Sequence, residues 1–295
     1  MISELFSIIF PVFVCAGIGY ALAHFKKQYD SGRVGFLVMV VGTPSLIFST
    51  LTKMEYPSGD VGMISLAALG SLILSALAGA MILKMSGLSL RGYLPSIIHP
   101  NAGNVGLPLA LFAFGEEGLL MGVAFFVVIA LSQFTVTPVV ASGRFSVRQL
   151  ASTPIIYAVA ASLVFMFTGL SVPKWLANTT QLLGNLTIPL LLITLGISLA
   201  QLRVGDLKNS LWVSIVRLSL GFGIGVLLAE ALGLEGAAKG IVILQSSMPV
   251  AVFNYLFAQQ FKTEAEGVAG TVVTSTLLTF LSLPFLMWYV LDFAA

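Results

Sequence analysis

The stretch His99-Pro100-Asn101-Ala102-Gly103-Asn104-Val105-Gly106-Leu107-Pro108 lies in the middle of an apolar segment that is otherwise long enough to cross a membrane. Its two prolines, two glycines and two asparagines disfavour a continuous helix, and Pro108 cannot donate a hydrogen bond to the carbonyl of Asn104. Backbone groups left unpaired at membrane depth are tolerated only where protein or a water-filled cavity satisfies them. The stretch therefore predicts a broken helix beside a cavity.

A second polar stretch, Gln245-Ser246-Ser247-Met248-Pro249-Val250-Ala251-Val252-Phe253-Asn254, interrupts an apolar segment of the second half. Pro249 leaves the carbonyl of Gln245 without its helical donor, and with one proline and no glycine this break is expected to be the weaker one. Such a pair is typical of inverted-repeat transporters, whose half-helix N-termini face an anion and whose free carbonyls face a cation. Two kinked packing helices with asparagines bonded to neighbouring helices are the alternative.

The composition places the whole chain in a membrane. Of its 295 residues 58% are hydrophobic and 9% are charged, so a water-soluble globule could not cover itself with polar surface. The net charge of +2 is scattered over short connections, which excludes a nucleic-acid surface. Cys15 is the only cysteine, and His24 and His99 stand far apart, so we expect no disulfide, no metal and no cofactor. The expected fold class is an all-α integral membrane protein.

Ten apolar segments are each long enough, at roughly 20 residues, to cross a hydrocarbon core of about 30 Å. The predicted spans lie near 3–24, 34–52, 61–83, 93–114, 118–140, 151–169, 176–200, 210–232, 237–259 and 268–291. The start of the first apolar run carries Glu4 but no Lys or Arg, and Lys26 and Lys27 follow the run. This charge order indicates a retained first span and not a cleaved signal peptide.

The basic residues of the connections predict the orientation of the spans. The connections after odd-numbered spans carry Lys26, Lys27, Arg33, Lys84, Arg91, Arg144, Arg148, Arg203, Lys208 and Lys262. Those after even-numbered spans carry only Lys53, Lys174 and Lys239, and the connection after span four also carries Glu116 and Glu117. We therefore expect the odd connections in the cytoplasm and both termini on the non-cytoplasmic side of the cell inner (plasma) membrane.

Proline positions recur between the two halves of the chain. The pairs Pro11 and Pro154, Pro44 and Pro189, Pro138 and Pro284, and Pro108 and Pro249 are separated by 143, 145, 146 and 141 residues. Because five spans is an odd number, a second copy enters the membrane from the opposite side, which makes the repeat inverted. The predicted units are 1–142 with spans one to five and 143–295 with spans six to ten, and chance agreement of the prolines is the alternative.

At these residues the chain resembles the auxin efflux carrier family of bacterial and plant permeases. The resemblance is carried by Asn-Ala-Gly-Asn-Val-Gly-Leu-Pro-Leu at 101–109 and by Gln-Ser-Ser-Met-Pro-Val-Ala-Val at 245–252, with Asn254 after the second motif. The short stretch 142–150 between the halves is similar to that of bacterial malate-, malonate- or auxin-type permeases. The resemblance implies a scaffold of spans one, two, six and seven and a transport unit of spans three to five and eight to ten. It also implies a site where the broken spans four and nine cross.

Two ionisable side chains lie within or beside predicted spans. Arg217 stands about nine residues beyond Lys208, hence on the order of 13 Å into span eight. It either neutralises or guards an anionic substrate, or it snorkels to the interface or pairs with helix-end carbonyls. His99 is a candidate proton relay, with a satisfied structural donor as the alternative. No pair of Asp or Glu lies inside the spans, so potential-driven exit of an organic anion is as plausible as sodium or proton coupling.

The predicted function is a secondary transporter, not an enzyme, that exports a small organic anion, auxin-like or dicarboxylate, by alternating access. A coupled symporter that imports an organic acid and an ion channel are alternatives. The chain has no Gly-x-Gly-Asp, Gly-x-Ser-Gly or Gly-Lys-Ser/Thr motif of intramembrane enzymes or ATP-driven pumps. The expected partners are the anion and the lipid bilayer, and a homodimer is left open. The predicted substrate-binding residues are Asn101, Gly103, Asn104, Gly106, Pro108, Ser246, Ser247, Pro249 and Asn254, with Arg217 and His99 as anion-binding or gating charges.

Overall fold

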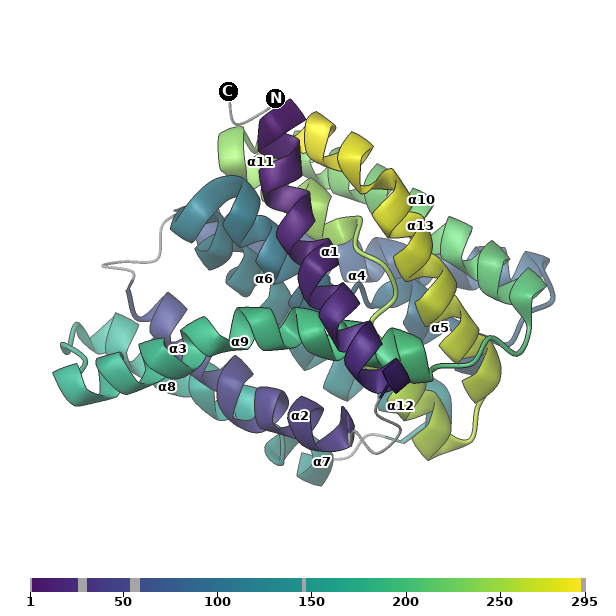
Figure 1. Cartoon of the computed structure of the whole chain (residues 1–295), viewed down its shortest axis with the longest axis horizontal. Coiled ribbons are helices and arrows are strands. Elements are labelled where there is room, and N and C mark those ends of the chain that lie inside the picture. Colours follow the sequence, from purple (N-terminus) through teal and green to yellow (C-terminus); the bar gives the residue numbers. More distant parts are fainter. Residues whose placement is uncertain (1, 26–30, 54–58, 145–146, 293–295) are drawn as a thin grey trace.

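The computed structural model describes residues 2–25, 31–53, 59–144 and 147–292, and the regular structure in these ranges is helical throughout. The predicted all-α fold class is therefore confirmed for the described part of the chain. The start of α1 (Ile2–Phe25) and the end of α13 (Ala265–Leu291) lie at the same edge of the molecule (Figure 1). Lys26 and Lys27, used above for the orientation, lie outside the described residues.

The described residues contain seven helical stretches that are long and apolar enough to cross a membrane, and one shorter apolar helix, α8. One such stretch, Val34–Leu51, runs through three consecutive elements, the middle one a π-helical turn. The remaining elements are α2 (Ser31–Leu37), η1 (Val38–Gly42), α3 (Thr43–Leu51), α4 (Gly59–Met85), α5 (Leu90–Ile98), η2 (Ala102–Gly106), α6 (Leu107–Ser142), α7 (Val147–Ala151), α8 (Pro154–Thr168), α9 (Lys174–Gln201), α10 (Leu207–Ala231), α11 (Gly236–Ser246) and α12 (Val252–Phe261).

The outward faces of the long helices are apolar. Leu77 and Met81 of α4, Leu281 and Phe285 of α13, and Trp175 of α9 are all exposed. Water would order around such surface at a cost in free energy, whereas lipid chains are as apolar as the side chains themselves. These faces suit contact with the hydrocarbon core of a bilayer.

The helices pack as two groups. α1 crosses and packs against α9, and α3 packs against both α8 and α9, so these helices contact mainly one another (Figure 1). In the second group α10 packs on α4, α11 and α13, while α6 packs on α4, α5, α11 and α12. Contacts between the two groups are sparser and run mainly through α6, η2 and α13.

The first break lies several residues before Pro108 in the sequence. α5 ends at Ile98, His99 is extended with φ −103° and ψ 106°, and the helical path resumes at Ala102. Pro108 stands in the first turn of α6, where proline is well tolerated, and the π-helical turn η2 runs directly into it. The break predicted within 99–108 is therefore found at 99–101, with Pro100 inside it, and Pro108 does not interrupt the helix.

The second break is longer than the first. α11 ends at Ser246 and α12 begins at Val252, which leaves residues 247–251 between them, against 99–101 at the first break. The expectation of a weaker second break is therefore wrong. The absence of glycine does not shorten it, because Ala251 is extended with φ −64° and ψ 134°, a conformation open to any residue.

Gly115 divides α6 into two helical parts. Its φ of 66° and ψ of −155° are non-helical and lie in a region that is essentially restricted to glycine. Without this corner α6 would run for 36 residues, far more than the roughly 20 that a bilayer core requires. The corner falls between the predicted spans four and five.

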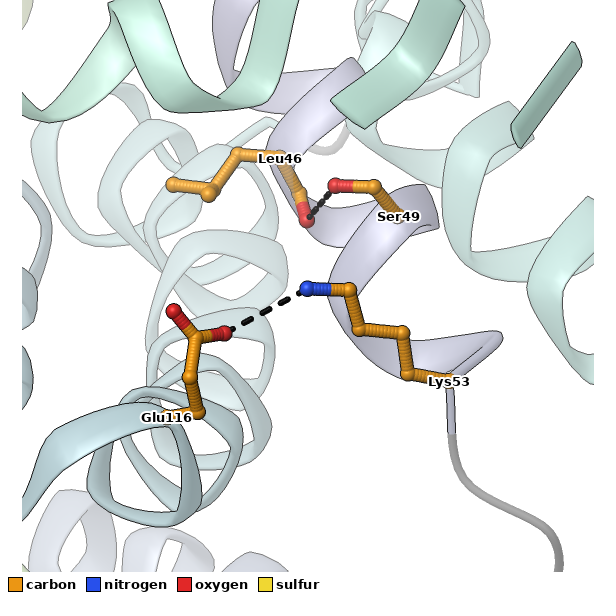
Figure 2. A network of polar contacts seen from close by, with 4 residues as sticks. All are labelled: Leu46, Ser49, Lys53 and Glu116. Carbon is orange, nitrogen blue, oxygen red and sulfur yellow. Dashed lines mark hydrogen bonds and ion pairs between the residues drawn. The ribbon is translucent and has the colours of Figure 1, made fainter. Parts of the chain in front are cut away.

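An ion pair links the two helix groups. Lys53, just after α3, approaches Glu116 of α6 with 3.3 Å between Nζ and Oε2, while the hydroxyl of Ser49 binds the carbonyl of Leu46 within α3 (Figure 2). Both charged side chains are exposed, so the pair contributes at most about 1 kcal/mol to stability. It brings the connections after predicted spans two and four to the same end of the molecule, as the predicted orientation requires.

We expect Gly115→Ala to lower the stability of the purified protein by about 1–3 kcal/mol, because a Cβ is strained at this φ and ψ. The measurement is the Tm in detergent. Gly223→Ala is the matched control, since its Cβ in α10 would meet nothing within 4 Å and alanine favours a helix. An equal Tm for the two variants would show that the corner carries no strain for other residues.

Candidate functional site

The two breaks hydrogen-bond to each other. Asn101 donates its backbone N–H to the carbonyl of Pro249 at 2.7 Å, and Ala251 donates to the carbonyl of His99 at 3.2 Å. Pro100 and Val250 thereby form an isolated antiparallel bridge. Each extended segment satisfies backbone groups of the other that no helix holds. We call this meeting point of α5–η2 with α11–α12 the crossing.

Two helical segments begin at the crossing. Asn101 is the N-cap of η2: its side-chain oxygen accepts the N–H of Asn104 at 3.2 Å, and its carbonyl accepts that of Gly106 at 3.2 Å. α12 begins after Ala251, which provides no side-chain cap. The N–H groups of a first turn amount to about half an elementary positive charge, which suits an anion. The crossing therefore combines two partially positive ends.

Arg217 of α10 packs against the crossing with its side chain fully buried. Its guanidinium donates hydrogen bonds to the carbonyls of Ile97 at 2.8 Å, Ser246 at 2.6 Å and Met248 at 3.3 Å. Ile97 and Ser246 stand at the C-terminal ends of α5 and α11. Gly221, one turn further along α10, permits this approach, because a Cβ there would overlap the carbonyl oxygen of Ser246. Of the readings considered for Arg217, the structure shows the pairing with helix-end carbonyls.

Asn254 joins three helices at the crossing. Its Nδ2 donates to the carbonyl of Pro95 at 3.1 Å and to that of His99 at 3.5 Å, and its Oδ1 accepts a hydrogen bond from Gln133 of α6 at 2.9 Å. The side chain is buried. Asn254 thus satisfies the end of α5 from the opposite half of the chain.

The His99 ring has partners on both nitrogens. Nδ1 lies 3.2 Å from the carbonyl oxygen of Pro95 and 3.3 Å from the hydroxyl of Thr137, and Nε2 lies 3.1 Å from the hydroxyl of Ser132. The ring is fully buried. Both ring nitrogens thus have hydrogen-bond partners, as the structural alternative expects, and a role of His99 as a proton relay stays a prediction.

Several buried polar atoms near the crossing have no hydrogen-bond partner in the described part of the chain. They are Nδ2 of Asn101, both amide atoms of Gln245 and the hydroxyls of Ser96 and Ser246. Leaving a buried polar group unpaired costs roughly 1–3 kcal/mol. Such a cluster is therefore available to a polar solute.

Gln245 was not among the predicted binding residues. Its side chain lies against Gly106 and Gly122, and a Cβ at Gly106 would overlap its amide. It is fully buried at the end of α11. The signal that would have found it is a carboxamide in an apolar span four residues before Pro249.

The remaining predicted residues occupy varied places. Gly103 lies in η2 beside the ring of Phe126, and Asn104, in the same turn, is half-buried. Ser247 donates its hydroxyl to the carbonyl of Ile243 at 2.6 Å, so it caps its own helix. The structure brings Asn101, Ser246, Pro249, Asn254, His99 and Arg217 together at the crossing, with Gly106 nearby against Gln245 and Pro108 in the first turn of α6.

Two cavities flank this region. One, of about 610 Å³, is lined by Glu117 and Met121 of α6 and by residues 232–238 before and at the start of α11. Met121 is adjacent in α6 to Gly122, where an added Cβ would lie 3.0 Å from the amide nitrogen of Gln245, so one wall of this cavity lies close to the crossing. The other, of about 670 Å³, is almost wholly apolar and includes Ile98 and Ser132 beside His99.

Broken helices that cross within a bundle of long apolar helices are typical of membrane transport proteins. The comparison with known families agrees: residues 135–287, just over half of the chain, match the family described as membrane transport protein. The chain belongs to this family, the auxin efflux carrier family that the motifs at 101–109 and 245–252 indicated. It is a multi-pass membrane transporter.

Similar proteins cover nearly the whole chain. An uncharacterized transporter of Methanocaldococcus jannaschii is 23% identical over 97% of this chain and 98% of its own length. An uncharacterized transporter of Methanothermobacter thermautotrophicus is 24% identical over 96% of each chain. A protein of Rhizobium meliloti named "Putative malonate transporter" is 23% identical over 94% of this chain and 93% of its own.

We expect Asn254→Ala to lower stability by about 1–3 kcal/mol. The change leaves the side-chain N–H of Gln133 without its acceptor and the carbonyl of Pro95 without its donor. The measurement is the Tm in detergent, with Gln259→Ala on the exposed side of α12 as control. Since Gln133 and Asn254 are bonded, the double variant Gln133→Ala/Asn254→Ala should cost less than the sum of the single ones. Additive losses would contradict this coupling.

Proposed function

We propose that this protein is a secondary transporter that moves a small organic anion outward by alternating access at the crossing. The observation that carries the proposal is the charge of the crossing. Two helical N-termini meet there, the Arg217 guanidinium offsets the helix C-termini whose carbonyls it binds, and among the described residues the buried side chains include no Asp or Glu. A buried surplus of positive charge favours an anionic ligand and disfavours a cationic one.

The proposed binding groups follow from what is left unpaired. The first N–H groups of η2 and α12 that no cap accepts, Nδ2 of Asn101 and the amide of Gln245 are donors within one region. Hydrogen bonds from backbone and amide N–H groups to a carboxylate are charge-assisted and roughly twice as strong as neutral ones. The proposed site comprises Asn101, Gly103, Asn104, Gly106, Pro108, Ser246, Ser247, Pro249 and Asn254, with Gln245 added.

An inverted repeat is supported by a constant offset. Pro100 and Val250, which face each other in the bridge, are 150 residues apart. Shifting α4 (Gly59–Met85) by 150 gives 209–235, close to α10 (Leu207–Ala231). Shifting α13 (Ala265–Leu291) back gives 115–141, which matches the part of α6 from the Gly115 corner to Ser142. The same offset pairs Asn104 with Asn254 and Ser96 with Ser246, and it supports units 1–142 and 143–295 with ten crossings.

The two helix groups support a division into a scaffold and a transport unit. The first group, α1, α2, α3, α8 and α9, corresponds to predicted spans one, two, six and seven, and the second to the other six. Apolar side chains of the scaffold, such as Val12 and Leu195, pack in one cluster with Val105 and Met248 of the crossing. An apolar boundary with few directional bonds allows one group to slide past the other.

Charge at the two ends supports outward movement. Glu117 and Glu235 line the cavity of about 610 Å³, at the end of the molecule where the predicted orientation places the non-cytoplasmic side of the plasma membrane. The connections at the other end carry most of the Lys and Arg residues. An acidic mouth repels anions that approach it, whereas a basic rim concentrates them. Anions therefore reach the crossing more readily from the predicted cytoplasmic side.

Similarity to one relative suggests which class of anion to test first. A relative 23% identical to this chain carries the name "Putative malonate transporter", which favours a small dicarboxylate over an aromatic acid as the first substrate to test.

We expect liposomes that contain the purified protein to release radiolabelled malonate with saturable kinetics and faster when unlabelled malonate is added outside. Asn101→Ala should raise the half-saturation concentration roughly 10-fold to 100-fold, since bonds to charged groups are worth about 1.5–3 kcal/mol. Gln260→Ala, at an exposed and uncharged position of α12, is the control. A flux that rises linearly with concentration and shows no counter-exchange would indicate a channel instead.

We expect a cross-link between the two helix groups to arrest transport, because the transport unit must move relative to the scaffold. In a Cys15→Ser background, Lys53→Cys/Glu116→Cys treated with a short bis-maleimide joins α3 to α6. The control is Ser86→Cys/Trp212→Cys, whose side chains form a 3.1 Å hydrogen bond within the transport unit. Full transport by the cross-linked first pair would refute this division of the chain.

A further inference from the structure

The carbonyls that Arg217 binds are of the kind that binds a coupling cation in other carriers. In transporters with broken helices, unwound carbonyls and the C-terminal ends of half-helices coordinate Na⁺ or H⁺. In this chain those ends belong to α5 and α11, and the Arg217 guanidinium takes the carbonyls of Ile97, Ser246 and Met248. A sodium ion would compete for the same oxygens.

Other carbonyls of the breaks are also engaged. The carbonyl of Pro95 accepts from Asn254, that of Pro249 accepts from Asn101, and that of His99 accepts from Ala251. Sodium binding would require these bonds or those of Arg217 to break. The fold thus satisfies with protein donors the oxygens that would otherwise surround an ion.

The charges balance without an added ion. Each helix C-terminus carries about half an elementary negative charge, so the ends of α5 and α11 together amount to roughly one, which the single charge of Arg217 neutralises. Adding Na⁺ would leave about one uncompensated positive charge in a buried, low-dielectric place. Ala67 of α4, the position 150 residues before Arg217, carries no charge, so one cation serves the helix ends of both halves.

We propose that the guanidinium of Arg217 replaces a coupling sodium ion at the crossing, so that this carrier moves its anion without sodium. The inference rests on the proposed function and adds to it the source of the driving force. With a permanent cation in place, the anion site is preformed whether or not sodium is present. The anion gradient and the membrane potential then drive transport.

Sodium itself is the probe for the first test. The Tm of the detergent-purified wild type is compared in sodium chloride and in choline chloride at equal ionic strength, because any ion that binds only the folded state raises Tm. We expect equal values. In Arg217→Gln we expect a lower Tm that rises with millimolar guanidinium or with sodium, because the carbonyls of Ile97, Ser246 and Met248 are then open to an external cation. Arg203→Gln, an exposed cation outside the crossing, should show neither effect.

Two outcomes would overturn the replacement. One is a sodium-dependent rise of the wild-type Tm, and the other is an Arg217→Gln variant whose Tm matches the wild type and ignores both cations. If Arg217→Gln does not fold, Arg217→Lys takes its place, with a smaller loss of Tm expected because a point charge cannot span the three carbonyls. The wild-type comparison decides in either case.

Transport separates this inference from the proposed function. Release of malonate from liposomes should be equal with an inward, an outward or no sodium gradient. Release that requires a sodium gradient would refute the role of Arg217 and leave anion transport standing. No release of malonate, auxin-like acids or other organic anions would refute the proposed function, while the thermal measurements would still report on Arg217.

Discussion

Backbone groups inside a bilayer must find hydrogen-bond partners within the protein, and the architecture of the crossing follows from this constraint. At each break the chain leaves the helical path and gives up its own partners. The Asn101 to Pro249 and Ala251 to His99 bonds let the two breaks satisfy each other. Two side chains donate to helix-end carbonyls that the bridge does not satisfy: Arg217 at the ends of α5 and α11, and Asn254 at the end of α5. Neither break would be stable in hydrocarbon without the other.

The same arrangement separates the two kinds of helix end by function. The C-terminal ends are closed by protein donors, so they add rigidity and hold the crossing as one body. The N-terminal ends of η2 and α12, together with Asn101 and Gln245, keep unused donors. In such a carrier the transport unit holds a preformed positive site and moves as a whole past the scaffold, because its contacts with α1 and α9 are apolar and few.

The all-helical fold and the approximate places of the two breaks were predictable from composition and from the positions of Pro, Gly and Asn in the apolar segments. The all-α fold and the two interruptions follow from local rules, since prolines and polar residues in apolar segments act within a turn or two. The details went wrong where a proline was taken as the break itself, because Pro108 opens a helix. The proline separations of 141–146 residues also fall short of the 150 that the bridge gives. In one pair the two prolines occupy different places, since Pro154 opens α8 while Pro11 lies inside α1.

The sequence by itself determined that this chain is embedded in a membrane, that its path is broken within 99–108 and near Pro249, and that Arg217 lies within an apolar span. These properties depend on hydropathy and backbone chemistry within short windows. Only the tertiary structure decided which carbonyls Arg217 binds, that Asn254 closes the end of α5 and that Gln245 remains unpaired. The bonds of Arg217 to Ile97 and of Asn254 to His99 join residues 120 and 155 positions apart. No local periodicity encodes such pairs, because they exist only once two helices from opposite halves have met.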